Sequence, residues 1–173
     1  MTDEDSRHGD ADWFRSVVQQ YEGQLVRYAA RLLGDVERAR DVVQETFLRL
    51  CRQPRAAVQD AVRPWLFTVC RRQAIDVRKK EQRMKALSDE HADSITSPLV
   101  DPQGAAELAE TAGRASALLG RLPENQREVI RLRIQNGLSY REISGVTGLS
   151  VSNVGFLIHQ GISRIRQQLN AAR

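Results

Sequence analysis

Apolar residues recur at three- and four-residue steps over the first third of the chain, with polar residues between them. This spacing puts the apolar residues on one face of a helix, and it predicts a first helix that ends at Gly34. Asp35 can cap a second helix, which keeps the same spacing as far as Pro54. A third helix is predicted from about Pro64, because proline fits the first turn of a helix. We therefore expect a helical bundle over residues 12–80.

A second helical block follows after an interruption. Residues 81–104 lose the helical period and gather acidic residues, serines and prolines, which predicts a flexible acidic linker. Residues 105–173 regain the period, first over about 105–119 and then from Pro123 to Gly137. Residues 1–11 are acidic and polar, and we expect a flexible N-terminus there. The predicted fold class is all-α, with two small helical domains joined by the linker.

The second block contains the pattern of a helix-turn-helix. Ser139 and Glu142 have the spacing of a capping box, and Gly148 allows the left-handed backbone of a tight turn. Ser150 or Ser152 can cap a long second helix that reaches about Leu169. Small residues at 144 and 145 suggest a close helix crossing. Such a pair of helices places its second helix in the DNA major groove, although an ordinary corner of a helical bundle shows the same pattern.

Charge is distributed unevenly along the chain. The formal net charge is only +4, yet residues 12–80 hold 14 basic and 8 acidic side chains, a net +6. Residues 105–173 hold nine basic and five acidic side chains, a net +4, and the N-terminus and linker carry −3 each. Two basic blocks, one with a helix-turn-helix pattern, favour DNA binding over a purely protein-binding helical module.

Several function classes find no support in the sequence. No run approaches the roughly 20 apolar residues of a membrane span, and the acidic start is unlike a secretory signal. There is no nucleotide-binding loop, metal-ligand cluster or nucleophile–base pair, so we expect no enzyme activity and no cofactor. Cys51 and Cys70 lie among apolar neighbours and are predicted to be buried free thiols in a reducing, cytoplasmic setting.

Three motifs in this order resemble bacterial RNA polymerase sigma factors of the extracytoplasmic-function group. They are ARDVVQETFLRLCRQ, PWLFTVCRRQAIDVRKKEQR and LPENQREVIRLRIQNGLSYREISGVTGLSVSNVG. The resemblance covers almost the whole chain. It implies core RNA polymerase and promoter DNA as partners, and small sigma factors are often held by an anti-sigma protein as well.

The resemblance also implies roles for individual residues. Contact with the polymerase clamp is implied for Asp41, Gln44, Glu45 and Arg49, although charged residues at this spacing are also typical of a solvated helix surface. Relatives often carry acidic residues just before this motif, where the chain has Arg38 and Arg40. Contact with the −10 element is implied for Arg71, Arg72, Arg78, Lys79 and Lys80. Trp65 and Phe67 could stack on bases, but the apolar spacing favours a core position for Trp65.

Recognition of the −35 element is implied for the helix-turn-helix. The residues concerned are Arg141, Ser152, Asn153, Phe156, His159, Gln160, Arg164 and Arg166. Relatives often have basic residues within the second helix, whereas no Lys or Arg occurs here between Arg141 and Arg164. Phe156 could touch thymine methyl groups, or it could pack on a partner protein or on the other domain. An autonomous dimeric DNA-binding regulator is the alternative to a sigma factor.

Overall fold

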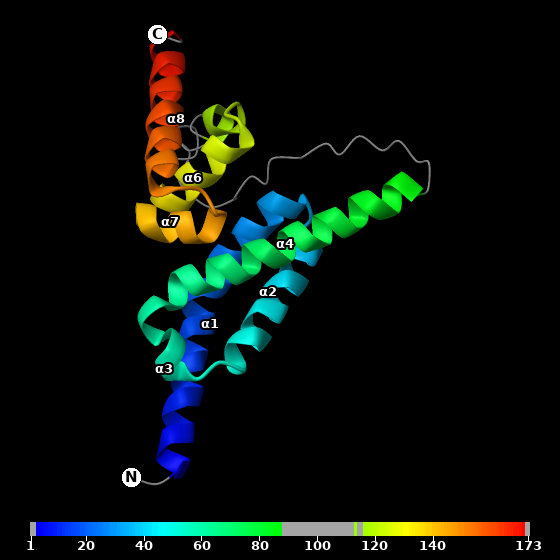
Figure 1. The fold of residues 1–173 in the computed structure, drawn as a ribbon, viewed down its shortest axis with the longest axis vertical. Coiled ribbons are helices and arrows are strands. Elements are labelled where there is room, and N and C mark those ends of the chain that lie inside the picture. The colour runs from blue at the N-terminus through cyan, green and yellow to red at the C-terminus, as the bar shows by residue number, and fades with distance from the viewer. Residues whose placement is uncertain (1–2, 88–112, 114–115, 172–173) are drawn as a thin grey trace. The chain divides into compact units, whose positions relative to one another are not determined.

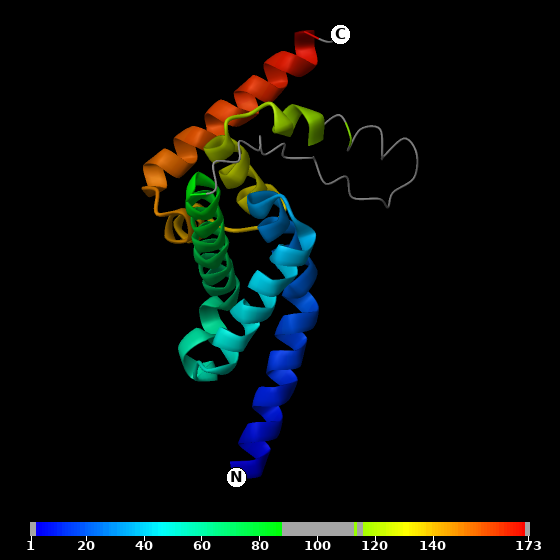
Figure 2. The same ribbon diagram turned by 90° about the vertical axis from the view of Figure 1, so that its right-hand side faces the viewer.

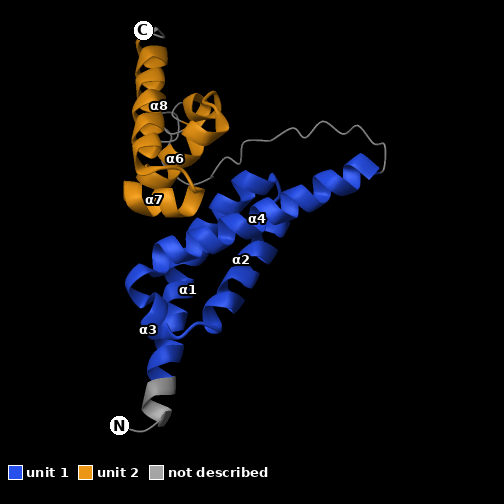
Figure 3. Ribbon diagram, in the orientation of Figure 1, with its two compact units in different colours: residues 1–97 blue, residues 98–173 orange. Residues whose placement is uncertain are grey.

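The structure is a computed structural model that describes residues 3–87, 113 and 116–171 (Figure 1). Within these ranges all regular structure is helical, which confirms the all-α prediction. The chain divides into two compact units, Met1–Ser97 and Pro98–Arg173, called unit 1 and unit 2 below (Figure 3). None of the described helices is both long enough and apolar enough to pass through a membrane.

Unit 1 is a bundle of three long helices, α1 (Asp3–Leu33), α2 (Val36–Cys51) and α4 (Val62–Leu87). Each packs against the other two, and their neighbouring courses can be followed in Figures 1 and 2. The predicted apolar faces meet in the core, where the largest fully buried side chains are Leu25, Leu50, Leu66 and Phe67. The rings of Tyr28 and Phe67 meet edge to face with centroids 5.2 Å apart. An edge-to-face contact of this kind adds to the stabilisation from area burial.

The predicted helix ends of unit 1 are confirmed where they depend on local signals. Gly34 has φ 72°, and the Asp35 carboxylate accepts hydrogen bonds from the backbone N–H groups of Glu37 and Arg38. Between α2 and α4 the chain forms a short helix α3 (Arg55–Val58) and a 3-10 turn η1 (Gln59–Ala61). Elements this short show no apolar period, and the sequence did not predict them. Pro64 lies in the first turn of α4, as expected.

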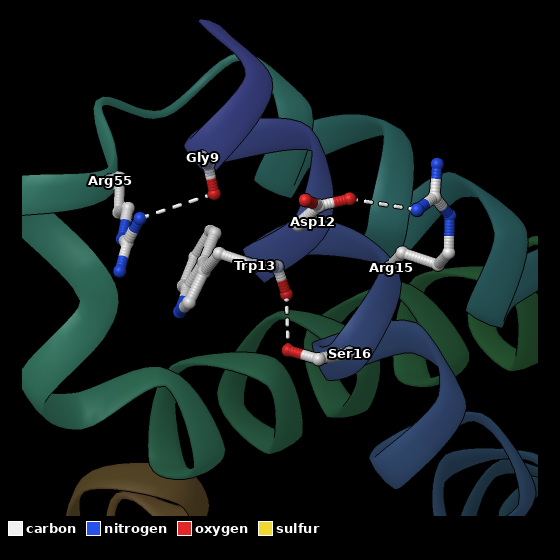
Figure 4. Close-up of polar contacts among 6 residues, drawn as sticks. All are labelled: Gly9, Asp12, Trp13, Arg15, Ser16 and Arg55. Carbon is white, nitrogen blue, oxygen red and sulfur yellow. Dashed lines mark hydrogen bonds and ion pairs between the residues drawn. The ribbon is translucent and has the colours of Figure 1, made fainter. Parts of the chain in front are cut away.

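The expected flexible N-terminus is wrong for residues 3–11, because α1 begins at Asp3. Figure 4 shows the contacts that hold the first turns. Nη1 of Arg55 donates to the carbonyl of Gly9 at 3.2 Å and lies 3.6 Å from the carboxylate of Asp10. The same guanidinium lies over the ring of Trp13, 5.5 Å from its centroid. A residue of α3 thus ties down a segment that looked unstructured from composition alone.

The domain boundaries remain predictions. Helix α4 continues to Leu87, so residues 81–87, expected as part of the linker, are helical. The rest of the predicted linker, from position 88 onward, lies outside the described residues, and so does most of the predicted helix 105–119. Residues 116–120 of that helix are described and helical.

Unit 2 contains α6 (Glu124–Ile134), α7 (Tyr140–Thr147) and α8 (Val151–Ala171). Its core is made by residues from all three helices and the loop before α7, including Val129, Leu138, Ile143 and Val154. Leu169, predicted to be part of the buried stripe of the last helix, is exposed. α7 contacts only the first part of α8, and the stripe therefore loses its cover toward the C-terminus.

The close helix crossing lies elsewhere than predicted. A Cβ placed on Gly145 would meet no atom within 4 Å, so α7 has open space there. A Cβ placed on Gly161 would lie 2.5 Å from Cδ1 of Ile130 and 3.4 Å from Cδ1 of Leu122. Gly161 therefore allows α8 to approach α6 closely.

The two cysteines differ in exposure. Cys70 is buried as predicted, but Cys51 is exposed at the end of α2, where the helix has turned past its buried face. Burial raises the pKa of the Cys70 thiol to about 12, against a smaller lowering effect of its hydrogen bond with Thr46. Thr46 and Gln73 are also buried, and Nε2 of Gln73 donates to the Thr46 hydroxyl at 3.0 Å. These three side chains form a small polar layer in the bundle.

Candidate nucleic-acid interface

The helix-turn-helix is held by local hydrogen bonds of the predicted kind. The backbone N–H of Glu142 donates to Oγ of Ser139 at 3.2 Å, and the backbone N–H of Ser139 donates to the Glu142 carboxylate at 2.6 Å. Gly148 has φ 76°, and the hydroxyl of Ser144 donates to the carbonyl of Leu149 at 2.6 Å. Oγ of Ser150, not Ser152, caps α8 by accepting from the backbone N–H of Asn153. The orientation of α8 relative to α7 is thus set by residues in and around the turn.

The exposed side of the first turns of α8 carries four of the predicted −35 residues. They are Ser152, Asn153, Phe156 and His159, and we call them the reading face. Phe156 is 60% exposed, whereas Val154, Leu157 and Ile158 are buried against the rest of unit 2. In a helix-turn-helix the N-terminal residues of the second helix are the ones that contact base edges. The reading face therefore lies where DNA contact is expected.

Two other predicted −35 residues are engaged with α6. Gln126 of α6 is buried, and its Nε2 donates to Oε1 of the half-buried Gln160. Oε1 of Gln126 accepts from Nη1 of Arg164 at 3.2 Å. The prediction that Gln160 reads bases is therefore wrong, because its side-chain oxygen closes the contact between α6 and α8. Arg141 and Arg166 are exposed and remain candidates for phosphate contact.

Tyr140 supports the second helix in a way that the sequence did not reveal. Its ring lies beside Gly155, where an added Cβ would be 3.5 Å from Cε2 of the tyrosine. The Arg133 guanidinium lies over the same ring at 5.5 Å and donates to the carbonyl of Leu138 at 3.0 Å. A glycine leaves room for this ring at a position where relatives often have a basic side chain. The missing charge at 155 thus has a packing reason.

Helix α4 presents a row of basic side chains in unit 1. Arg72, Lys79, Lys80 and Arg83 are exposed, and we call them the basic stripe. Residues 72, 79 and 83 share one face of the helix, since they are separated by seven and four positions. Arg71 and Arg78, also predicted to contact the −10 element, are half-buried and already make contacts within unit 1. The exposed residues are the better placed to neutralise phosphates.

The two aromatic candidates beside this stripe exchange roles. Phe67 is fully buried against Tyr28, so it has no face free for a base. Trp65, which the spacing placed in the core, is only half-buried. Apolar spacing in this first turn does not distinguish the two, because the chain enters α4 from η1 rather than from a long preceding helix.

Helix α2 presents a second surface on the side away from the bundle core. Asp41, Gln44 and Arg49 are exposed, Glu45 is half-buried, and Oε1 of Glu45 accepts from Nε of Arg49 at 3.1 Å. Leu48 lies among them and is exposed, although the sequence analysis did not single it out. We call these five residues the docking face. An apolar side chain within the polar face of an amphipathic helix was the signal that could have identified Leu48.

The docking face borders a groove between α1 and α2. Its apolar lining includes Phe14, Val26 and Phe47, and Gln44 and Leu48 belong to both the groove and the docking face. Arg27 and Arg40 add positive charge to the lining. A surface with an apolar floor and polar edges is suited to a protein partner rather than to DNA alone.

Comparison with known proteins identifies the family. The Sigma-70 region 2 family matches residues 17–84, and the Sigma-70 region 4 family matches residues 113–165. The chain is 30% identical over 172 residues to the ECF RNA polymerase sigma factor SigD of Mycobacterium bovis, which covers 95% of this chain and 80% of that protein. The chain belongs to the ECF sigma factors. The expected resemblance is thereby confirmed, and the sigma factor is a non-enzymatic factor that directs transcription initiation at promoters.

Other relatives agree with this assignment. The sigma factor is 27% identical over 154 residues to SigM of Bacillus subtilis, covering 89% of this chain and 93% of that protein. Among solved structures it resembles the sigma factor RpoE in complex with the anti-sigma factor NepR from Bartonella quintana, with a TM-score of 0.67 and 22% identity over 92% of this chain and 98% of that chain. CnrH in complex with the cytosolic domain of CnrY has a TM-score of 0.57 and 24% identity, covering 92% and 89%. These two structures support the fold, and no match supports an autonomous dimeric regulator.

The departure at Arg38 and Arg40 acquires a structural explanation in this sigma factor. Nη1 of Arg38 lies 2.5 Å from Oε1 of Glu81, and its Nε lies 3.5 Å from the Asp35 carboxylate. Arg40 pairs with Glu37 at 2.7 Å. Both arginines therefore have partners within unit 1. Arg38 joins α2 to α4, a contact that an acidic residue at position 38 could not make with Glu81.

Proposed function

We propose that the two units of this sigma factor divide the recognition of polymerase and promoter between them. Unit 1 binds core RNA polymerase through the docking face of α2 and contacts the −10 element through the basic stripe of α4. Unit 2 binds the −35 element as duplex DNA through the reading face of α8, with Arg141 and Arg166 on phosphates. The factor acts in the cytoplasm, where RNA polymerase is, and leaves the chemistry to the polymerase.

The observation that carries this proposal is the exposure of three separate polar surfaces on helices whose opposite faces are buried. The basic stripe offers positive charge for a DNA strand, and the docking face offers a mixed surface with an exposed leucine. Single-stranded DNA is bound through phosphate neutralisation, whereas specific protein contacts need an apolar centre with a polar rim. The two surfaces of unit 1 therefore suit different partners.

An anti-sigma protein is a further proposed partner. The two solved relatives are each held by such a regulator or by its cytosolic domain, as described for NepR and CnrY. The apolar groove between α1 and α2 supports this proposal, because a regulator that covered it would also cover part of the docking face.

Two triple variants test the division of roles within unit 1. The stripe variant carries R72A, K79A and K80A, and the docking variant carries D41A, Q44A and R49A. We expect the stripe variant to bind core polymerase normally but to open promoter DNA poorly. Its salt dependence should fall by a slope of up to about 2, at about 0.7 for each phosphate contact on a single strand. The docking variant should fail to bind core. Loss of core binding by the stripe variant would contradict the assignment.

A further inference from the structure

The reading face of α8 combines one large apolar side chain with polar neighbours and carries no positive charge. Phe156 is the apolar residue, and no Lys or Arg occurs between Arg141 and Arg164. The commonest specific contact in the major groove, a basic side chain on the O6 and N7 atoms of guanine, cannot be made from this part of the helix. The side chains present define a different kind of base contact.

The surroundings of Phe156 argue against a protein-binding patch. Its neighbours one turn away on the helix surface are Ser152, Asn153, His159 and Gln160, all of them polar. Protein interaction sites are usually contiguous apolar patches of several hundred square ångströms. A single phenylalanine between hydrogen-bonding groups instead matches the edge of an A·T pair, which presents a methyl group beside hydrogen-bond donors and acceptors.

The local structure also keeps acidic groups away from this face. The only acidic residue of α7 is Glu142, whose carboxylate accepts from the backbone N–H of Ser139 in the capping box, and α8 contains none. Asn153 is exposed in the first turn, and only its backbone N–H is used in the cap at Ser150. An asparagine amide can bond both N6 and N7 of adenine. The face thus offers an apolar contact and an adenine-type contact three residues apart.

We propose that Phe156 reads the 5-methyl group of thymine and Asn153 reads adenine, so that this sigma factor selects A·T pairs where α8 enters the −35 element. The inference rests on the proposed function of unit 2 and specifies the class of DNA that it recognises. Guanine contacts are not required beneath the first two turns of α8. Phosphate contacts from Arg141 and Arg166 supply affinity without sequence preference.

The test uses holoenzyme assembled from the full chain and core RNA polymerase. Preferred −35 sequences are first selected from promoters with a randomised −35 region, and we expect A·T pairs at the central selected positions. Each thymine is then replaced singly with deoxyuridine, which removes only the 5-methyl group. Loss of one buried methyl group should weaken binding of the wild-type holoenzyme about fourfold at one or more positions. Phe156→Ala should bind the two DNAs equally.

Two controls make the measurement specific. Leu169→Ala removes another exposed apolar residue of α8, beyond the turns expected to read bases, and should keep the full deoxyuridine effect. Replacing adenine with 7-deazaadenine removes N7 and should weaken wild-type binding about fivefold or more at one position, but not that of Asn153→Ala. The proposal is overturned if wild-type binding ignores every thymine replacement, if Phe156→Ala keeps the full effect, or if selection enriches guanine at these positions.

Failure of the proposed function is distinguishable from failure of this inference. Co-elution of each variant with core polymerase is measured before any DNA is added. A chain that does not associate with core contradicts the proposed function itself. A holoenzyme that assembles and initiates on selected promoters, yet ignores the thymine methyl groups, contradicts only the role of Phe156.

Discussion

Arg38 of α2 and Glu81 of α4 form an ion pair, with Nη1 and Oε1 2.5 Å apart. The pair joins the beginning of one long helix to the last two turns of another. Glu81 belongs to a segment whose composition suggested a linker, and the contact helps to explain why α4 continues as a helix to Leu87. An arginine at position 38 is thereby used inside unit 1, although it lies close to the docking face.

This pair is expected to make a small, salt-sensitive contribution to the stability of unit 1. We expect a coupling free energy of about 0.5 kcal/mol between Arg38→Ala and Glu81→Ala, because both side chains are partly exposed to solvent. Both tryptophans lie in unit 1, so urea unfolding followed by tryptophan fluorescence reports on this unit. The coupling should shrink in 1 M salt, and core binding should stay unchanged. A large loss of core affinity in Arg38→Ala would instead make Arg38 part of the interface.

Two glycines of unit 2 should respond in opposite ways to substitution by alanine. Gly145→Ala adds a methyl group in open space within α7 and should stabilise the protein by about 0.5–1 kcal/mol through helix propensity. Gly161→Ala forces a methyl group against Ile130, and overpacking of this kind costs about 1–3 kcal/mol. Thermal unfolding followed by far-ultraviolet circular dichroism measures both. Equal stability of the two variants would contradict the close contact between α6 and α8.

The two thiols should react at very different rates in the folded protein. The thiolate is the reactive form, and burial raises the pKa of Cys70 to about 12, so Cys70 stays protonated and covered at pH 8. Cys51 is exposed at the end of α2. We expect an aromatic disulfide reagent to titrate one thiol rapidly at pH 8 and the second only in denaturant. The variant Cys51→Ser should show no fast phase, and a fast phase in that variant would mean that Cys70 is accessible.

The first turns of α1 should depend on Arg55. Its side chain bonds the Gly9 carbonyl and covers Trp13, so Arg55→Ala should speed amide hydrogen exchange about fivefold over the first turns of α1, equivalent to about 1 kcal/mol. Arg15→Ala is a matched control, because Arg15 pairs only with Asp12 on the same helix. If both variants exchange alike, the contact with α3 does not hold the N-terminal turns.

Much of the candidate site could be predicted because its signals are local. The capping box of Ser139 and Glu142, the left-handed Gly148 and the exposed position of Phe156 all follow from residues within a few positions of one another. The errors concern contacts between distant parts of the chain. Gln160 was predicted to read bases because its spacing fits the reading face, but its partner Gln126 lies 34 residues earlier on α6. Leu48 was overlooked because a single leucine on a polar face is common.

The sequence by itself determined the helices, the turn between α7 and α8, the absence of positive charge from the reading face and the resemblance to sigma factors. Helical period, capping and charge are properties of neighbouring residues and can be read along one dimension. Only the tertiary structure decided that Phe67 is buried and Trp65 half-buried, that Arg38 pairs with Glu81, and that Gly161 rather than Gly145 allows close packing. Those outcomes depend on which side of each helix meets another, and that is set by the packing of side chains far apart in sequence.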